Sequence, residues 1–185
     1  MKKIIFYQLE DIQKQVYPSI AKRLGYTMIS LDDNDLDKTL KDLFTVEENH
    51  RGICEEFQDS FFVMNEMTTQ DLMILLDAFQ TAKMPYKGIK VMRTETNENW
   101  TLRELFQETS EEHQMFQNVK LLDQLLKSSN TVDLSLLKEE EREHFKQTLM
   151  ASFLLLKSGQ FTKEELDHAI QEMKDALMMV KKAVH

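Results

Sequence analysis

The stretch that decides the fold is residues 61–113, FFVMNEMTTQDLMILLDAFQTAKMPYKGIKVMRTETNENWTLRELFQETSEEH. Its apolar runs of strand length alternate with segments of helical periodicity. Thr68 and Thr101 are each followed three positions later by an acidic residue, a capping-box pattern that marks the start of a helix. The predicted elements are strands over residues 60–67 and 86–93 and helices over residues 69–83 and from Leu102 onward.

The residues before this stretch also alternate between strand and helix patterns. The predicted elements are strands over residues 3–9 and 26–31 and helices over residues 12–24 and 36–44. Strands separated by helices imply right-handed crossovers and a parallel sheet. We therefore expect an α/β domain over residues 1–116, with a small parallel sheet of about four strands in the order 2-1-3-4, flanked by helices. Residues 45–59 are polar and receive no assignment, and no internal repeat is apparent.

The chain beyond residue 116 predicts a helical extension over residues 117–185. The apolar register slips near Gln117, so a separate short helix is expected over residues 119–127, followed by helices over residues 134–157 and from Thr162. The last two helices carry facing apolar stripes and should form an antiparallel αα-hairpin. The stripes are Leu166, Ile170, Met173, Leu177, Val180 and Val184 on one helix and Phe145, Leu149, Phe153 and Leu156 on the other. Either the α/β domain or a second chain is expected to cover the remaining apolar surface.

Composition and charge exclude several classes of function. The net charge is −9 and the basic residues are scattered, so the chain offers no basic face for nucleic acid. No apolar run approaches the roughly 18 residues needed to cross a bilayer, and the apolar run of residues 4–7 is too short for the core of a signal peptide. The single cysteine, Cys54, fits a reducing compartment. We expect a cytoplasmic protein that binds neither nucleic acid nor membrane.

Part of the chain resembles a known family. The segments FVMNEM, TTQDLMILLDAF and KVMRTETNENWTLRELFQETSEEH are similar to an uncharacterised bacterial family described only as a domain of unknown function, and the similarity covers about residues 61–116. Members of that family carry a Thr-x-x-Asn-x-x-Trp-Thr loop followed by Glu-Glu-His. These family residues fall here on Thr94, Asn97, Trp100, Thr101, Glu111, Glu112 and His113. The resemblance implies no activity.

The loop of residues 94–101 is the first candidate binding site. It follows the fourth predicted strand, and ligands of parallel sheets bind at the carboxyl ends of the strands. The indole of Trp100, beside amides and a helix start, can hold a small polar molecule or a partner backbone, or it can simply pack as a hydrophobic staple. The candidate ligand-binding or partner-binding residues are Thr94, Asn97, Asn99, Trp100, Thr101 and His113. None of them is expected to be catalytic, because no serine or cysteine nucleophile can be paired with His113.

Acidic residues after the predicted strands form a second candidate site. They could converge on a divalent cation or a basic partner, or they could complement helix macrodipoles from the first turns of helices. The residues concerned are Glu10, Asp11, Asp32, Asp33, Asp35, Glu66, Glu95 and Glu98.

Two Glu-x-x-His motifs lie in the predicted hairpin, and di-iron bundles use this motif twice. In an antiparallel hairpin His144 would lie level with residue 176, on the order of 12 Å along the axis from His168 at about 1.5 Å per residue. The motifs that begin at Glu141 and Glu165 therefore cannot share a metal, and we expect neither a metal nor a cofactor.

These patterns favour a non-enzymatic binding or protein-interaction module. It would use the sheet edge near Trp100, and its C-terminal helices would bind a protein partner or self-associate. The alternative is a small-molecule or metal-dependent enzyme that uses the same edge of the sheet. Catalysis needs titratable groups within hydrogen-bond reach of one another, whereas a binding module needs only exposed anchors.

Overall fold

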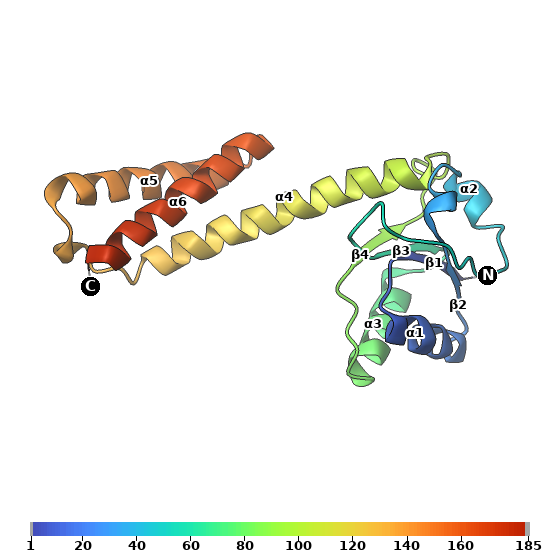
Figure 1. Cartoon of the computed structure of the whole chain (residues 1–185). Helices are drawn as coiled ribbons and strands as arrows, with labels where there is room; N and C mark the ends of the chain where they lie inside the picture. Colours follow the sequence, from blue (N-terminus) through green and yellow to red (C-terminus); the bar gives the residue numbers. More distant parts are fainter. Residues whose placement is uncertain (1, 184–185) are drawn as a thin grey trace. The chain divides into compact units, whose positions relative to one another are not determined.

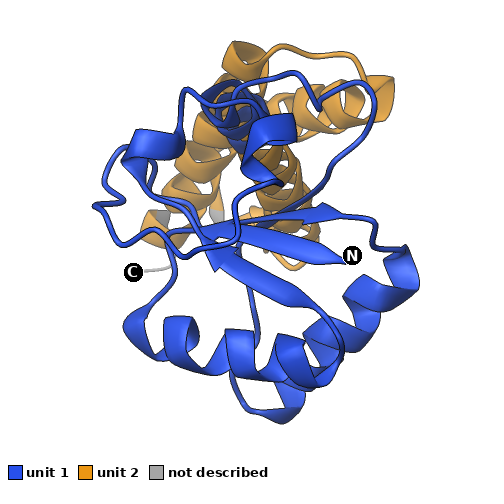
Figure 2. Ribbon diagram, turned by 90° about the vertical axis from the view of Figure 1, so that its right-hand side faces the viewer, with its two compact units in different colours: residues 1–111 blue, residues 112–185 orange. Residues whose placement is uncertain are grey.

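The computed structural model describes residues 2–183 and forms two compact units, Met1–Glu111 and Glu112–His185 (Figure 2). In chain order the first unit contains β1 Lys3–Tyr7, α1 Asp11–Arg23, β2 Thr27–Ser30, the 3-10 turn η1 Asp33–Asp35, α2 Leu40–Leu43, β3 Phe61–Asn65, α3 Thr69–Thr81 and β4 Ile89–Met92 (Figure 1). Helix α4, Leu102–Ser129, begins in the first unit and continues into the second, which also holds η2 Leu134–Leu136, α5 Glu139–Ser158 and α6 Lys163–Ala183.

The strand order β2-β1-β3-β4 confirms the predicted order, but the sheet is mixed. β1 pairs with β2, and β3 with β4, in parallel, whereas β1 and β3 run antiparallel. The path of residues 45–59, which form no strand or α-helix, sets the direction of β3. After α2 the chain lies beside the start of β1, where Lys3 Nζ donates to Phe44 O at 2.9 Å. It then returns along β2, where His50 N donates to Ser30 O at 2.9 Å, so β3 begins where β1 ends.

The antiparallel pair divides the acidic residues between two ends of the sheet. The carboxyl ends of β1 and β2 lie at one end, and those of β3 and β4 lie at the other. The eight acidic side chains therefore cannot converge on one site, and the alternative that they do is wrong. Glu10, Asp11, Asp32, Asp33 and Asp35 follow β1 or β2, whereas Glu66, Glu95 and Glu98 follow β3 or β4.

The first unit consists of two structural repeats, and the expectation that the chain has no repeat is wrong. The first repeat, residues 3–44, and the second repeat, residues 61–106, each contain a strand, a helix, a parallel strand and a helix start. Equivalent turns even share positive φ angles: Gln8 at 57° matches Glu66 at 59°, and Gly25 at 82° matches Lys83 at 59°.

The two repeats are related by an approximate twofold axis. Ile5 pairs with Val63 at the centre of the antiparallel ladder, and Thr39 bridges Thr101. The backbone hydrogen bonds beside that bridge come in symmetric pairs, in which each repeat donates to the other from equivalent positions. These pairs show which residues of the two repeats are equivalent. The hydrogen bonds are Leu40 N to Trp100 O and Leu102 N to Lys38 O, both 3.0 Å, and Lys41 N to Glu98 O at 2.9 Å and Arg103 N to Leu36 O at 2.8 Å.

Two apolar layers sandwich the sheet. α1 and α3 cover one face, and η1, α2 and the start of α4 cover the other (Figure 1). Because side chains alternate along a strand, Ile4 enters the first layer and Ile5 the second. Stacked aromatic pairs tie helix and loop residues to β3, including Phe61 with Phe106 and Phe62 with Tyr86, each with ring centroids 3.7 Å apart. The predicted α/β class is confirmed.

In the second unit α5 and α6 form the predicted hairpin, which turns at Gly159 with φ 63°. The predicted stripe packs from Leu166 to Val180, while Val184 lies outside the described residues. On α5, Phe145 is buried, but Phe153 is 51% exposed, so its place in the facing stripe is wrong. Among the described residues, no helix is both long and apolar enough to cross a bilayer.

Helix α4 covers one side of the hairpin in this unit, a surface that the prediction did not include among its alternatives. Its later residues, including Val119 and Leu122, pack into the cluster formed with α5 and α6. The predicted separate helix over residues 119–127 is wrong, because α4 is continuous. The apolar register changes near Gln117 because the two parts of α4 pack in different units. Leu105 and Phe106 pack in the first unit, whereas the later apolar residues of α4 pack in the second.

Candidate functional site

The predicted loop of residues 94–101 is closed by its own polar groups. Thr94 N donates to Asn97 Oδ1 at 2.8 Å, and Asn97 Nδ2 donates to Met92 O at 3.0 Å. Thr101 and Glu104 form the predicted capping box, with Thr101 N donating to Glu104 Oε2 at 2.8 Å and Glu104 N donating to Thr101 Oγ1 at 3.2 Å. These contacts give Asn97 and Thr101 structural roles.

Trp100 is half-buried and packs against the apolar layer that contains Leu40 and Leu102. Thr94 and Asn99 are exposed, and Arg93 forms an ion pair with Glu98 at 2.7 Å across the loop. This packing agrees better with Trp100 as a hydrophobic staple than with Trp100 as an exposed binding anchor. Ligand binding by the loop stays a prediction.

His113 belongs to the second compact unit rather than to the loop. It is half-buried on α4, and its Nε2 lies 3.3 Å from Gln117 Nε2, one turn farther along the helix. The first unit's loop and His113 are therefore separate features of the chain.

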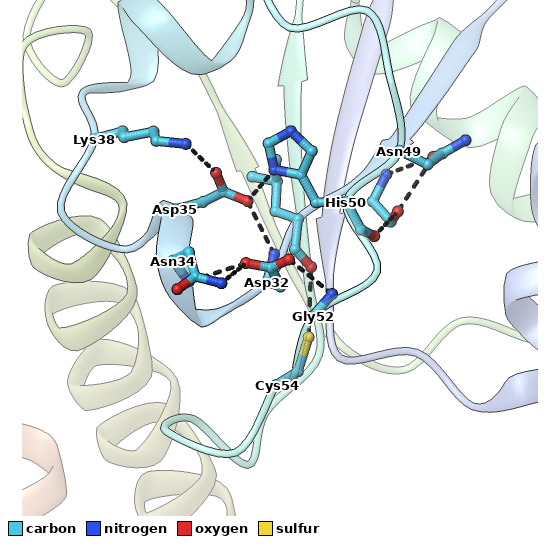
Figure 3. Close-up of polar contacts among 10 residues, drawn as sticks. Asp32, Asn34, Asp35, Lys38, Asn49, His50, Gly52 and Cys54 are labelled. Carbon is cyan, nitrogen blue, oxygen red and sulfur yellow. Dashed lines mark hydrogen bonds and ion pairs between the residues drawn. The ribbon is translucent and has the colours of Figure 1, made fainter.

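A buried carboxylate, Asp35, organises the end of the sheet where β1 and β2 finish (Figure 3). Its Oδ1 accepts from Lys38 Nζ at 2.7 Å, and its Oδ2 accepts from Asp32 N at 3.0 Å and lies 2.6 Å from His50 Nδ1. Burial by itself would raise the pKa of Asp35, but the hydrogen bonds from Lys38, Asp32 and His50 outweigh burial and hold the pKa below its ordinary value. An ionised Asp35 thus orients the His50 ring, as carboxylates do for many functional histidines.

Asp32 fastens the same segment from the other side. Its Oδ1 accepts from Asn34 N at 2.9 Å, and its Oδ2 accepts from Gly52 N at 2.7 Å. A Cβ at position 52 would lie 2.4 Å from Asp32 Oδ2, so only glycine allows this approach. Together Asp32 and Asp35 hold residues 49–54, named the return loop here, against the end of β2.

Asp32, Asp35 and His50 also have ligand atoms within 4.8 Å of one another, the spacing of a candidate cation site. Carboxylate and imidazole are suitable ligands for several divalent metals. However, all four carboxylate oxygens already accept hydrogen bonds, and a cation would compete with the Lys38 ammonium group on Asp35. Asp32, Asp35 and His50 are named the acid–histidine group here. Their hydrogen bonds are sufficient to hold the return loop in place without a cation. His50 was missed because it lies in the unassigned residues 45–59.

A pocket of about 520 Å³ adjoins the return loop. It lies at the carboxyl ends of the parallel strands β1 and β2, the location that α/β folds favour for ligands. The polar side chains lining it come from the residue after β1, from α1, from the end of β2 and from the return loop. They are Gln8, Lys14, Gln15, Ser30, Asn49, His50 and Arg51. Cys54 also borders the pocket, and burial raises the pKa of its thiol, which disfavours a reactive thiolate.

The second unit has an exposed apolar surface of its own. Met150, Phe153 and Leu154, named the α5 face here, are 58%, 51% and 54% exposed and occupy adjacent turns on one side of α5. A separate groove of about 430 Å³ lies between α5 and α6 and is bordered by His144, Glu165 and His168. In the part of the chain that the structure describes, neither histidine belongs to a candidate cation group.

Residues 60–116 match the model of a family described as "Domain of unknown function (DUF3783)", which agrees with the predicted resemblance. The match covers β3, α3, β4 and the first part of α4, so it contains the second repeat and leaves out the first. No curated protein and no solved structure matches the chain.

Proposed function

We propose that this protein is a non-enzymatic binding module that self-associates through the α5 face. The observation that carries the proposal is the exposure of Met150, Phe153 and Leu154, each more than half accessible on one side of a helix whose other side is packed. Contiguous exposed apolar side chains on an otherwise polar surface commonly mark protein-interaction sites.

The spacing of these three side chains suits a symmetric pair of helices. In a twofold interface the same patch meets itself, so Met150 of one copy would lie on Phe153 or Leu154 of the other in an antiparallel crossing. Removing the exposed part of such a side chain from water is worth roughly 1 kcal/mol, and a dimer buries six of them. This gain supports a weak, concentration-dependent dimer rather than an obligate one.

Sedimentation velocity over a wide range of protein concentration tests the proposal. The wild-type protein should shift towards the dimer as concentration rises, and Phe153→Asp should remain monomeric with an unchanged melting temperature, because Phe153 is exposed in the monomer. Lys174→Asp, at an exposed position on α6 and outside the α5 face, serves as the matched control and should still dimerise. A wild-type protein that stays monomeric at its highest soluble concentration would refute the proposal.

A second candidate function is a small-molecule or metal-dependent enzyme at the β1–β2 end of the sheet. The observation that favours it is the acid–histidine group beside the 520 Å³ pocket. A thermal-shift titration with Zn²⁺ and Mn²⁺ tests the metal-dependent form, since a bound cation stabilises the folded state and Asp35→Asn should abolish that stabilisation. We also propose a cytoplasmic location and no binding to nucleic acid, on the basis of one cysteine and a net charge of −9.

A further inference from the structure

The second repeat provides an internal comparison for the pocket of the first. α1 and α3 follow equivalent strands and turns, so Lys14 and Gln15 on α1 correspond to Leu72 and Met73 on α3. In the first repeat these two positions carry polar side chains that line the pocket, whereas in the second they are apolar.

The return loop has no counterpart in the second repeat. In the first repeat Ser30 O accepts from His50 N at 2.9 Å, and Asp33 N donates to Ile53 O at 2.9 Å. At the equivalent place in the second repeat Met92 O accepts from the side chain of Asn97, and the chain continues into α4. Within residues 2–183, the loop and the pocket beneath it are therefore features of the first repeat alone.

The turn after the second strand does not itself require charged residues. Thr94 N donates to Asn97 Oδ1 at 2.8 Å in the second repeat, as Asp32 N donates to Asp35 Oδ2 at 3.0 Å in the first. A neutral side chain at position 35 could thus close the turn, and the carboxylate adds the contact with His50. That contact fixes the ring through Nδ1 and leaves Nε2 pointing away from Asp35 (Figure 3).

Three groups that are or can become cationic, Lys14, His50 and Arg51, border one pocket in a protein of net charge −9. Among the described residues, no carboxylate lines this pocket. Lys14 makes a loose pair with Asp11 at 3.6 Å, and both side chains of that pair are well exposed, so the ammonium group remains available to a ligand.

We propose that the pocket of the first repeat binds a small molecule that carries a carboxylate or phosphate group. Arg51 offers paired donors that match either group, and Lys14 adds a point charge. The His50 ring, held through Nδ1 by Asp35, borders the same pocket. The amides of Gln8, Gln15 and Asn49 suit the uncharged polar part of such a molecule. The site does not depend on the α5 face, which lies in the other compact unit.

Isothermal titration calorimetry of the full-length protein with citrate and with inorganic phosphate tests the proposal. Saturable binding of either probe to the wild-type protein is expected, and a preference between the two identifies the anionic group that the pocket selects. Arg51→Ala and Lys14→Gln should each weaken binding by about tenfold or more, as expected for the loss of a charge-assisted contact. Both positions are exposed, and thermal melts should show unchanged folding.

Arg23→Ala is the matched control, because Arg23 is an exposed arginine at the end of α1 that does not line the pocket. It should bind both probes like the wild-type protein. The proposal is overturned if neither probe binds, if Arg23→Ala weakens binding as much as Arg51→Ala, or if binding appears only after Zn²⁺ or Mn²⁺ is added. Binding that requires Zn²⁺ or Mn²⁺ would mean that a metal at the acid–histidine group, and not Lys14 and Arg51, binds the anionic group of the ligand.

Discussion

Replacing Gly52 with alanine should loosen the return loop by a mechanism that the geometry defines closely. The added methyl group would lie 2.4 Å from Asp32 Oδ2 and 2.6 Å from Asp32 Cγ, far inside ordinary contact distance. Asp32 is 5% exposed and is held by Asn34, so the carboxylate must shift or the loop must lift away. Either movement breaks the 2.7 Å hydrogen bond from Gly52 N to Asp32 Oδ2.

The expected cost follows from the contact that is lost. A hydrogen bond to a charged acceptor contributes about 1.5–3 kcal/mol, and the displaced carboxylate remains partly buried, so Gly52→Ala should lower the free energy of unfolding by about 2 kcal/mol. Urea denaturation, followed by Trp100 fluorescence, measures this change in the first unit. The slope against urea should stay constant, because the surface exposed on unfolding hardly changes.

A double-mutant cycle separates the clash from other effects of alanine. In an Asp32→Ala background the methyl group meets no carboxylate and only the 3.0 Å contact with the Cβ atom at position 32 remains, so adding Gly52→Ala should cost less, about 1 kcal/mol or below. The reasoning is refuted if Gly52→Ala is neutral in the wild-type background or if its cost is the same in both backgrounds.

Three further predictions concern other parts of the fold. Hydrogen bonds keep the pKa of Asp35 below its unfolded value, so the stabilisation they give is present above about pH 4 and is lost as the pH falls through the folded pKa. Asp35→Asn should flatten this acid dependence of the free energy of unfolding in urea titrations, and an unchanged profile would contradict the prediction. Trp100→Ala should lower the free energy of unfolding by about 2 kcal/mol, less than the loss of a fully buried aromatic side chain, because Trp100 is half-buried. The tryptophan fluorescence of the wild-type protein should be blue-shifted, and a red-shifted, freely quenched emission would instead favour an exposed anchor. Leu177→Asp should lower the melting temperature of the second unit by placing a charge among α4, α5 and α6, and an unchanged melt would show that this side chain does not pack there.

The strand order was predictable from the sequence, whereas the direction of β3 was not. Apolar runs and capping boxes located the elements, including the helix starts at Thr68 and Thr101. The direction of β3 depends on the path of residues 45–59, which have no periodicity and are held by specific contacts such as that between Gly52 and Asp32. His50 lies in the same stretch, so no periodicity in the sequence places it beside Asp35.

The repeat was hidden because its two copies preserve burial and backbone geometry more than residue identity. Ile5 and Val63, which pair at the axis, illustrate this conservative change. The clearest sequence trace is TLKDLF at residues 39–44 against TLRELF at residues 101–106, and aligning these two segments would have revealed the repeat. Equivalent capping contacts, from Asp42 N to Thr39 and from Glu104 N to Thr101, explain why this motif is retained in both copies.

Hydrogen–deuterium exchange of the full-length protein at low and high concentration tests the proposed self-association most directly. If the α5 face joins two copies, amides of α5 around Met150 to Leu154 should gain protection as concentration rises, while those of β1 and β3 should not change. Phe153→Asp should remove the concentration dependence. Exchange that is independent of concentration, or protection that rises only in another element, would contradict the account.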